Sequence, residues 1–136
     1  MILRKATMDD CDFIFNLRNE PYVRNASWNT EKIDYQKHKG WFKNNYKYYH
    51  IIGDSKGFVR IKDNEVSIAV VKEEQNTGLG TAALNEIAKI HPNLKAEVKI
   101  SNIQSLNFFI NAGFKPVGYI LKKIDTKEEQ KWGFYV

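Results

Sequence analysis

The segment Gln75-Asn76-Thr77-Gly78-Leu79-Gly80 connects a β-branched run, Val66 to Val71, to a helix predicted over residues 81–90. Its two glycines allow backbone N–H groups to point into one concavity without obstruction by a Cβ atom. The start of the following helix adds the positive end of the helix dipole. The segment therefore predicts a site for an anion such as a pyrophosphate.

Several phosphate-binding patterns compete for this turn. A Walker A loop, G-x-x-x-x-G-K-[ST], does not occur in the sequence. Residues 78–83 formally match the dinucleotide fingerprint G-x-G-x-x-A, but six residues, 72–77, separate them from the strand that they should follow directly. A third pattern, Q-x-x-G-x-G, includes Gln75. A glycine-rich helix start that binds no ligand is the fourth interpretation, and the turn alone leaves it open.

The elements around the turn predict an α/β (α+β) fold. Helical spacing and caps predict helices over residues 8–17, 34–44, 81–90 and 103–112. Short β-rich runs predict strands over residues 2–7, 48–52, 58–62, 65–71, 94–100, 115–123 and 131–135. The expected architecture is a mixed, mostly antiparallel sheet of six to seven strands with about four helices on both faces. Its parallel crossover unit connects residues 66–71 to 94–100.

Composition limits the class of protein. The 136 residues, 43% of them hydrophobic, suit one domain over residues 1–136. No apolar run approaches the roughly 20 residues that span a bilayer, and the N-terminus is too short and polar for a signal peptide. A single cysteine, Cys11, excludes an internal disulfide framework. We therefore expect a cytoplasmic protein without a membrane partner.

The charge pattern indicates anionic ligands but names none. There are 21 basic and 16 acidic residues, a formal charge of +5. Such a surplus favours phosphates, nucleotides or nucleic acid. The basic residues are scattered, which favours a solvated surface over a nucleic-acid interface. No metal is expected, because His38, His50 and His91 show no ligand spacing with carboxylates or with Cys11.

A second segment selects among the phosphate patterns. Residues 102–114 read N-x-x-S-x-x-x-F-x-x-x-G-F and follow the strand predicted over 94–100. This segment resembles motif B of the GCN5-related N-acetyltransferases. The glycine turn, Q-x-x-G-x-G after the preceding strand, resembles motif A of the same family. The predicted order of elements resembles that family over essentially the whole chain.

The resemblance implies a site for acetyl-CoA. The pyrophosphate would lie on backbone N–H groups of Gln75, Asn76, Thr77, Gly78, Leu79 and Gly80, with the Thr81 hydroxyl nearby. The pantetheine arm would pair with the strand edge at Ala69, Val70 and Val71, and the Val70 N–H would polarise the thioester carbonyl. Asn102 would bind the pantetheine amides, and Ser105 and Phe109 would flank the thiol.

Phe109 departs from the family pattern. The family often has a tyrosine there, which protonates the departing thiolate, and phenylalanine has no proton to donate. A thiol has a pKa of about 8.5, so thiolate is a tolerable leaving group and water could suffice. This departure raises the alternative of a non-catalytic acyl-CoA-binding module.

The acceptor amine must lose a proton, and a carboxylate is the expected base. Glu97 is the first candidate, because its parity is opposite to that of Ala96 and Val98 and would turn it toward the first two helices. Glu65, at the start of its strand, is the second candidate. The alternatives are a Glu97 paired with a neighbouring lysine and a Glu65 on the surface beside a hairpin.

The string L-R-N-x-P at residues 17–21, followed by H-x-x-W-F at 38–42, resembles the branch of the family that acetylates amino groups of nucleotide-linked sugars, as in spore-coat and flagellar glycan enzymes. It resembles less closely the branch that acetylates ribosomal-protein N-termini. The substrate-binding candidates are Arg18, Asn19, Trp28 and His38. Arg18 could contact a phosphate and Trp28 could stack on a base or sugar, whereas His38 could equally be a packed helix residue.

Together these features predict an N-acetyltransferase that moves acetyl from acetyl-CoA to a nucleotide-linked amino sugar. Transfer would be direct, in a ternary complex, and the enzyme would be a monomer or homodimer. The alternatives are a protein N-terminal acetyltransferase, a non-catalytic acyl-CoA-binding module and, most weakly, a basic nucleic-acid-binding domain.

Overall fold

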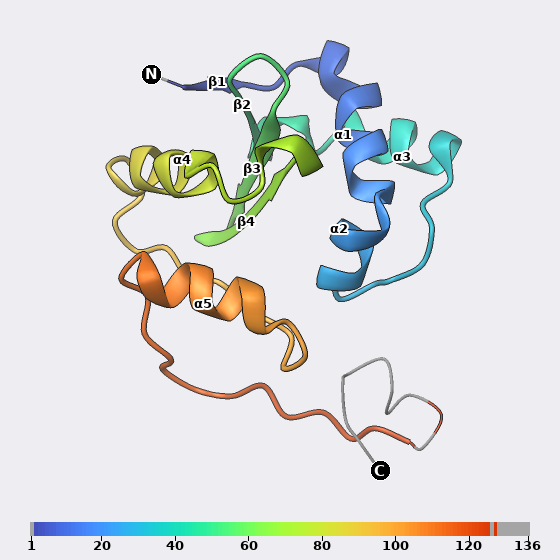
Figure 1. Ribbon diagram of the computed structural model, residues 1–136. Coiled ribbons are helices and arrows are strands. Elements are labelled where there is room, and N and C mark those ends of the chain that lie inside the picture. The colour runs from blue at the N-terminus through green and yellow to red at the C-terminus, as the bar shows by residue number, and fades with distance from the viewer. Residues whose placement is uncertain (1, 126, 128–136) are drawn as a thin grey trace.

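The computed structural model describes residues 2–125 and 127 of the chain (Figure 1). The strands are β1 (Leu3–Lys5), β2 (Tyr49–Ile52), β3 (Gly57–Lys62) and β4 (Glu65–Val70). The α-helices are α1 (Cys11–Asn19), α2 (Pro21–Ala26), α3 (Tyr35–Phe42), α4 (Leu79–Ala88) and α5 (Ile103–Asn111). Short 3-10 turns are η1 (Met8–Asp10), η2 (Tyr46–Tyr48) and η3 (Lys72–Glu74). The first four predicted strands and all four predicted helices are confirmed, with ends displaced by a few residues.

The sheet is an antiparallel meander in the order β1-β2-β3-β4. Lys62 pairs with Glu65 across a two-residue turn, Asp63-Asn64, whose φ angles are 52° and 65°. Positive φ at both positions is typical of a type I′ hairpin, and this turn fixes the register of β4 against β3. Tyr49, Arg60 and Ser67 are consecutive partners in the ladder, so their side chains form one row on one face of the sheet.

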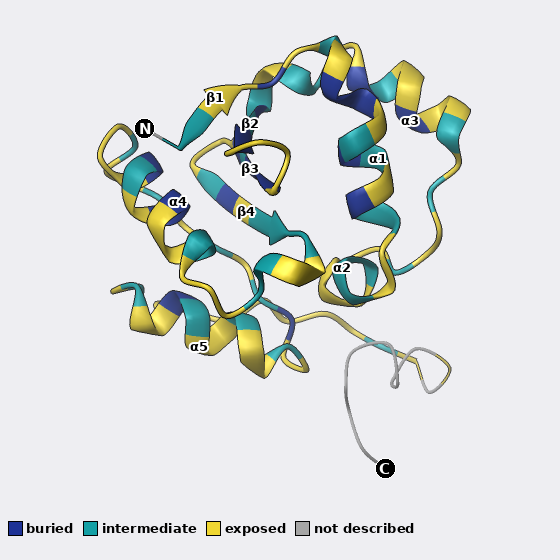
Figure 2. Ribbon diagram, turned by 45° about the horizontal axis from the view of Figure 1, so that its top comes forward, coloured by how far each residue is buried: buried dark blue, intermediate teal, exposed yellow. Residues whose placement is uncertain are grey.

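Helices cover both faces of this sheet (Figures 1 and 2). On one face α1 and α3 enclose a core that contains Ile14, Leu17, Phe42 and Ile51. On the other face α4 and α5 enclose a second core that includes Ala83, Leu84, Ile87 and Phe109. Strand residues alternate between the two cores, as a pleated strand requires. The two-faced, mixed α/β arrangement is therefore as predicted.

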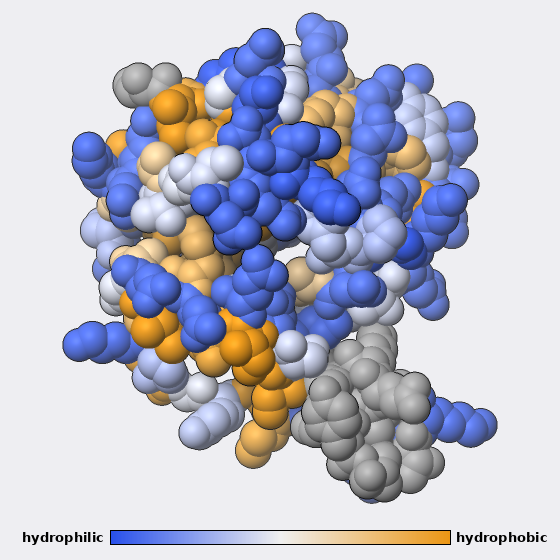
Figure 3. Space-filling view, in the orientation of Figure 1, coloured by the Kyte–Doolittle hydropathy of each residue, from blue (hydrophilic) through white to orange (hydrophobic). Residues whose placement is uncertain are grey.

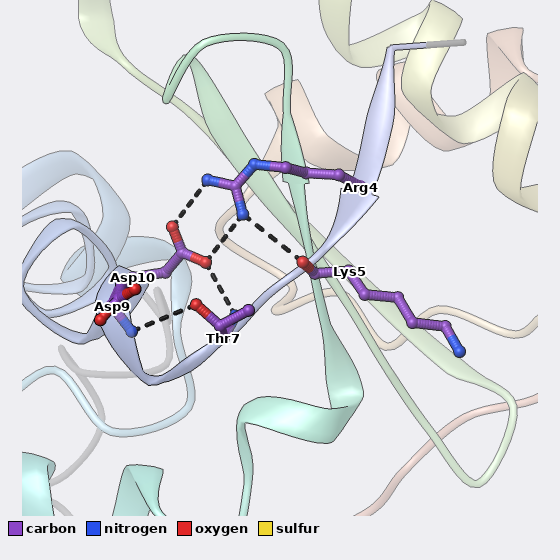
Figure 4. Close-up of polar contacts among 5 residues, drawn as sticks. All are labelled: Arg4, Lys5, Thr7, Asp9 and Asp10. Carbon is purple, nitrogen blue, oxygen red and sulfur yellow. Dashed lines mark hydrogen bonds and ion pairs between the residues drawn. The ribbon is translucent and has the colours of Figure 1, made fainter.

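An ion pair joins β1 to the start of the first helical segment (Figure 4). The Asp10 carboxylate accepts hydrogen bonds from both terminal nitrogens of Arg4, at 2.9 and 2.8 Å, and from the Thr7 N–H at 2.8 Å. Thr7 in turn accepts from the Asp9 N–H, which completes a capping box. The bond to Arg4 lowers the pKa of Asp10. This cap fixes the start of the helical segment that continues into α1, the helix that carries Arg18.

The prediction of six to seven strands is wrong for the described residues, which form four. Residues 94–100 alternate as expected, because Ala96 and Val98 pack toward α4 and α5, but they make only one parallel bridge, between Lys95 and Glu65. Residues 115–123 form no strand either. A β-prone run needs a paired neighbour, and the unpaired segment 94–100 supplies none. The strand predicted over residues 131–135 lies outside the described part of the chain.

Helix α2 was not predicted. Pro21 follows the end of α1 and also occupies the first turn of α2. Its missing N–H removes no hydrogen bond there, because the first N–H groups of a helix have no partner within the helix. The count of about four helices is therefore corrected to five α-helices within residues 2–125 and 127.

Apolar side chains gather over α5 in the space-filling view (Figure 3). Ile103, Leu106 and Ile110 on that helix are between 36% and 57% exposed. The same helix packs on the sheet through Phe109, which is 9% exposed. Gly113, with φ +97°, supplies the left-handed residue that commonly follows a helix.

Candidate active site

A cleft of about 380 Å³ is lined by β4 and by the segment 94–100. Glu65 and Ser67 line it from the face of the sheet that carries α1 to α3, and Ile68 and Phe109 line it from the other face. The cleft therefore lies along the edge of the sheet formed by β4, beside the segment that fails to pair as a fifth strand. A ligand in it would contact both faces at once.

The open edge of β4 offers backbone hydrogen-bonding groups to this cleft. Val71 donates its N–H to Lys56 on the β3 side, and Val66 donates to Lys95 on the opposite side. By strand alternation, Ile68 and Val70 also turn their backbone groups away from β3. Of the three residues expected to pair with pantetheine, Ala69, Val70 and Val71, only Val70 has this orientation. Ile68, which was not predicted, shares it and lines the cleft.

Tyr22 occupies one acceptor on that edge. Its hydroxyl donates to the Val70 carbonyl at 2.7 Å, which links α2 to β4. Burial raises the pKa of Tyr22, so the hydroxyl keeps its proton at neutral pH. The Val70 N–H, assigned to the thioester carbonyl, is on the same edge. No pattern in the sequence marks Tyr22, because α2 itself was not predicted.

The glycine turn lies at the start of α4, as predicted. Gly78 is the N-terminal cap of the helix and has φ +86°, a conformation that favours glycine. The first N–H groups of a helix have no partners within it, so those of Gly80 and Thr81 can bind an anion. Asn76, at φ +62°, adds another left-handed residue. Residues 75–81 do not line the cleft of β4, so the glycine turn and the cleft are separate features of the structure.

Two carboxylates lie together in the cleft. Glu65 and Glu97 both line it, from β4 and from the segment 94–100. Burial raises the pKa of Glu65, and the charge and hydrogen bonding of Glu97 raise it further, whereas Arg60 and Lys95 oppose the rise. Glu97 thus lies beside Glu65 in the cleft, while its neighbours Ala96 and Val98 pack toward α4 and α5; its role as the base stays a prediction. One carboxylate of such a pair is poised to take up a proton.

Cationic and aromatic side chains face these carboxylates. Arg18 from α1, Arg60 from β3 and Trp28 from the loop after α2 line the same cleft. The Arg18 guanidinium lies 4.6 Å from the centroid of the Trp41 ring. Arg60 was not predicted, although the register of the Asp63-Asn64 hairpin places it on the same face as Glu65. The cleft thus carries both signs of charge.

The other predicted substrate residues, Asn19 and His38, do not line the cleft. The Asn19 amide is engaged by the backbone of Ile33, donating at 3.0 Å and accepting at 2.7 Å, so it holds the loop before α3. His38 is 1% exposed and lies among aromatic rings. Both residues act from behind the cleft wall.

The motif B residues lie where the cleft meets α5. Asn102, Ser105 and Phe109 all line it. The Asn102 side chain also caps α5 by accepting from the Ser105 N–H at 3.1 Å. The Phe109 ring packs against those of Phe108 and Phe114, with centroids 5.1 Å apart in each pair. Phe109 is therefore both a core residue and a wall of the cleft.

The described residues were also compared with the requirements for a metal site and for a membrane span. Within residues 2–125 and 127, no three histidine, cysteine, aspartate or glutamate side chains are grouped so that they could hold a metal ion. No helix in this part of the chain is long and apolar enough to cross a bilayer.

Comparison with known proteins identifies the family. Residues 11–114 match the model of the acetyltransferase (GNAT) family. None of the curated proteins matches the chain. Among solved structures, a domain from Methanocaldococcus jannaschii has a TM-score of 0.75 at 19% identity, over 85% of this chain and 88% of that one.

Two further structures carry ligands. Spermidine N-acetyltransferase from Vibrio cholerae, in complex with CoA and spermine, has a TM-score of 0.74 at 16% identity, over 90% of this chain and 85% of that one. A putative acetyltransferase from Salmonella typhimurium, solved with acetyl-CoA, has a TM-score of 0.65 at 22% identity, over 84% and 79%. At these identities the structures establish the shared fold, and the family model establishes membership. The chain belongs to the GNAT family and is an N-acetyltransferase that uses acetyl-CoA.

Proposed function

We propose that the acceptor is the primary amine of a nucleotide-linked amino sugar. The observation that carries this proposal is the mixed charge of the cleft, in which Glu65 and Glu97 lie together with Arg18, Arg60 and Trp28. Carboxylates suit an amine, a guanidinium suits a phosphate, and an indole ring suits a base or sugar face. A polyamine carries only positive charge, and the three arginines that line the cleft, Arg18, Arg24 and Arg60, disfavour it.

The residues divide the work of direct transfer. Bound acetyl-CoA supplies the acetyl group as a thioester. N–H groups at the start of α4 hold the pyrophosphate, and Ile68 and Val70 on the open β4 edge hold the arm, with the Val70 N–H directed at the thioester carbonyl. Glu97, with Glu65 as its partner, accepts the proton of the amine as its nitrogen bonds to the acetyl carbon and the carbon–sulfur bond breaks. Water supplies the proton for the thiolate, because Phe109 has none to give.

The same proposal includes a cytoplasmic enzyme that acts as a monomer or homodimer on a small molecule. The alternatives predicted from the sequence are outcomes of one experiment. The purified chain is incubated with acetyl-CoA and a panel of amino-sugar nucleotides, N-terminal peptides and spermidine, and thiol release is measured.

We expect release with an amino-sugar nucleotide. Release with peptides alone would instead select the protein N-terminal acetyltransferase. Tight CoA binding without release from any acceptor would select the non-catalytic module. A matched sugar nucleotide that lacks the amino group is the control, because it occupies the cleft but cannot be acetylated.

A further inference from the structure

The buried His38 ring contacts Arg18, a half-buried residue that lines the cleft. His38 Nδ1 lies 3.0 Å from a terminal nitrogen of Arg18, and His38 Nε2 lies 3.1 Å from the Cys11 carbonyl oxygen. Both partners belong to α1, whereas His38 belongs to α3. The imidazole, 1% exposed, therefore connects the two helices at the point where Arg18 enters the cleft.

The two partners determine where the imidazole proton resides. A guanidinium can only donate, so Nδ1 must accept; a carbonyl can only accept, so Nε2 must donate. Only the neutral ring protonated on Nε2 satisfies both contacts. A second proton on Nδ1 would direct an N–H of a cationic ring at a guanidinium 3.0 Å away. His38 can therefore hold Arg18 only while it is uncharged.

Arg18 itself is held without being neutralised. Its contacts are the neutral His38 ring and the face of Trp41, 4.6 Å from the guanidinium carbon. Among residues 2–125 and 127, no carboxylate forms an ion pair with it. A largely enclosed guanidinium normally has an anionic partner. Because Arg18 lines the cleft, an anionic group of the acceptor could fill that role.

We propose that His38 is a positioning residue that, in its neutral Nε2–H form, orients Arg18 to bind an anionic group of the acceptor. His38 does not touch the substrate. The identity of the anionic group as a nucleotide phosphate rests on the proposed function, whereas the positioning of Arg18 does not.

The charges around the pair agree with a neutral ring. Burial lowers the pKa of His38, the Arg18 charge lowers it further, and the contact with Cys11 and the charge of Asp12 oppose this. The remaining neighbours that bear on Arg18 are Tyr49 from β2 and Arg60 from β3. The rings of Phe15, Trp41 and Phe42 complete the surroundings of His38.

The tautomer is tested directly by the two-bond ¹H–¹⁵N correlations of the His38 ring in the intact protein. We expect the pattern of an imidazole protonated on Nε2 at neutral pH, lost only below the usual histidine range near pH 6.5. A ring protonated on Nδ1, or a doubly protonated ring at pH 7, would overturn the proposal. This measurement needs no substrate.

A double-mutant cycle tests the coupling. Binding of uridine diphosphate is followed by tryptophan fluorescence in wild type, His38→Leu, Arg18→Gln and the double variant. We expect His38→Leu to weaken binding about tenfold, the loss of roughly one charge-assisted hydrogen bond, and to add little once Arg18 is replaced. Additive losses would contradict the proposal. Lys39→Gln, an exposed charge removed one residue away on α3, is the control.

His38→Asn protects the test from a folding defect. It offers the guanidinium an amide oxygen that does not titrate, so we expect near-wild-type affinity for uridine diphosphate without weakening at acid pH. The positioning role would be overturned if His38→Asn bound uridine diphosphate as weakly as His38→Leu does while unfolding at the same temperature as wild type. If uridine diphosphate binding follows these expectations and no sugar nucleotide is acetylated, the proposed acceptor is wrong and the positioning role stands.

Discussion

Replacing Glu97 and Glu65 by glutamine, singly and together, tests how the cleft removes the acceptor's proton. A general base typically contributes about 10²- to 10⁴-fold, or roughly 3 to 5.5 kcal/mol of barrier. The two carboxylates line one cleft, and the charge of Glu97 helps to raise the pKa of Glu65. Each can therefore partly substitute for its partner. We expect each single variant to lose about tenfold in kcat, and the double variant to lose the full amount.

The pH profile distinguishes a base from a structural carboxylate. The base must be deprotonated to act, so kcat rises as pH passes upward through its pKa. Glu97→Gln removes a negative neighbour and so lowers the pKa of Glu65, because that neighbour helps to raise it. The acidic limb of the profile should move to lower pH, and the deficit should shrink at high pH, where the amine is already neutral.

The assay is thiol release with saturating acetyl-CoA. Glu31→Gln is the matched control, because Glu31 is a third carboxylate that lines the cleft. The reasoning would be refuted by a double variant that retains wild-type kcat with an unchanged pH profile while still binding CoA. In that case the proton leaves to water without help from either glutamate.

Four further predictions follow from single residues. Gly80→Val should weaken CoA binding measured by calorimetry, with little loss of stability, because a Cβ at position 80 would meet its nearest side-chain atom at 3.4 Å. Gly78→Val should weaken CoA binding and also lower Tm, because residue 78 has φ +86°, which valine rarely adopts. Lys99→Met should cost about 2 kcal/mol in urea unfolding and raise the acceptor KM, because the buried Lys99 ammonium donates to two carbonyls at the end of α2, at 2.9 and 3.2 Å. Asp10→Asn should destabilise the fold above about pH 4; the native carboxyl pKa is lowered, so the wild-type advantage should disappear as pH falls through it. Phe109→Tyr should change kcat little and remain folded, and a variant that unfolds would place Phe109 in the core alone.

The parts of the fold that the sequence predicts well are those with local causes. The Asp63-Asn64 turn, the glycine at position 78, the Thr7 cap of η1 and the glycine that follows α5 act within a few residues, and each is present in the structure. The strand over 94–100 needed a partner as well as a pattern. Its alternation is real, but pairing ends after Lys95, and Lys99 is bonded to Asn25 and Ser27 at the end of α2 instead. Periodicity does not report such long-range competition.

The candidate site shows the same difference between features with local causes and features that depend on long-range contacts. Parity was sufficient to separate Glu97, which lines the cleft with Glu65, from Ala96 and Val98, since it depends only on alternation along one segment. It could not show that Asn19 is engaged by Ile33 or that His38 faces Arg18, because those contacts join residues that are 14 and 20 positions apart. Nor could it find Tyr22, whose partner on β4 is 48 positions away. Residue type indicated which side chains could bind a substrate, and packing decided which of them reach it.

The unpaired edge of β4 explains why the failed strand prediction coincides with the candidate site. A complete ladder between β4 and residues 94–100 would occupy the backbone groups of Ile68 and Val70 and close the cleft between the two segments. One bridge, at Glu65, instead fixes the separation at one end while the edge beyond it stays open. Glu65 and Glu97 therefore lie near the bridged end of this opening. Asn102 and Phe109 line the same cleft beside α5. The arm of acetyl-CoA would therefore complete the sheet as a missing strand, with its thioester directed at the carboxylate pair, and removing the gap would remove the site.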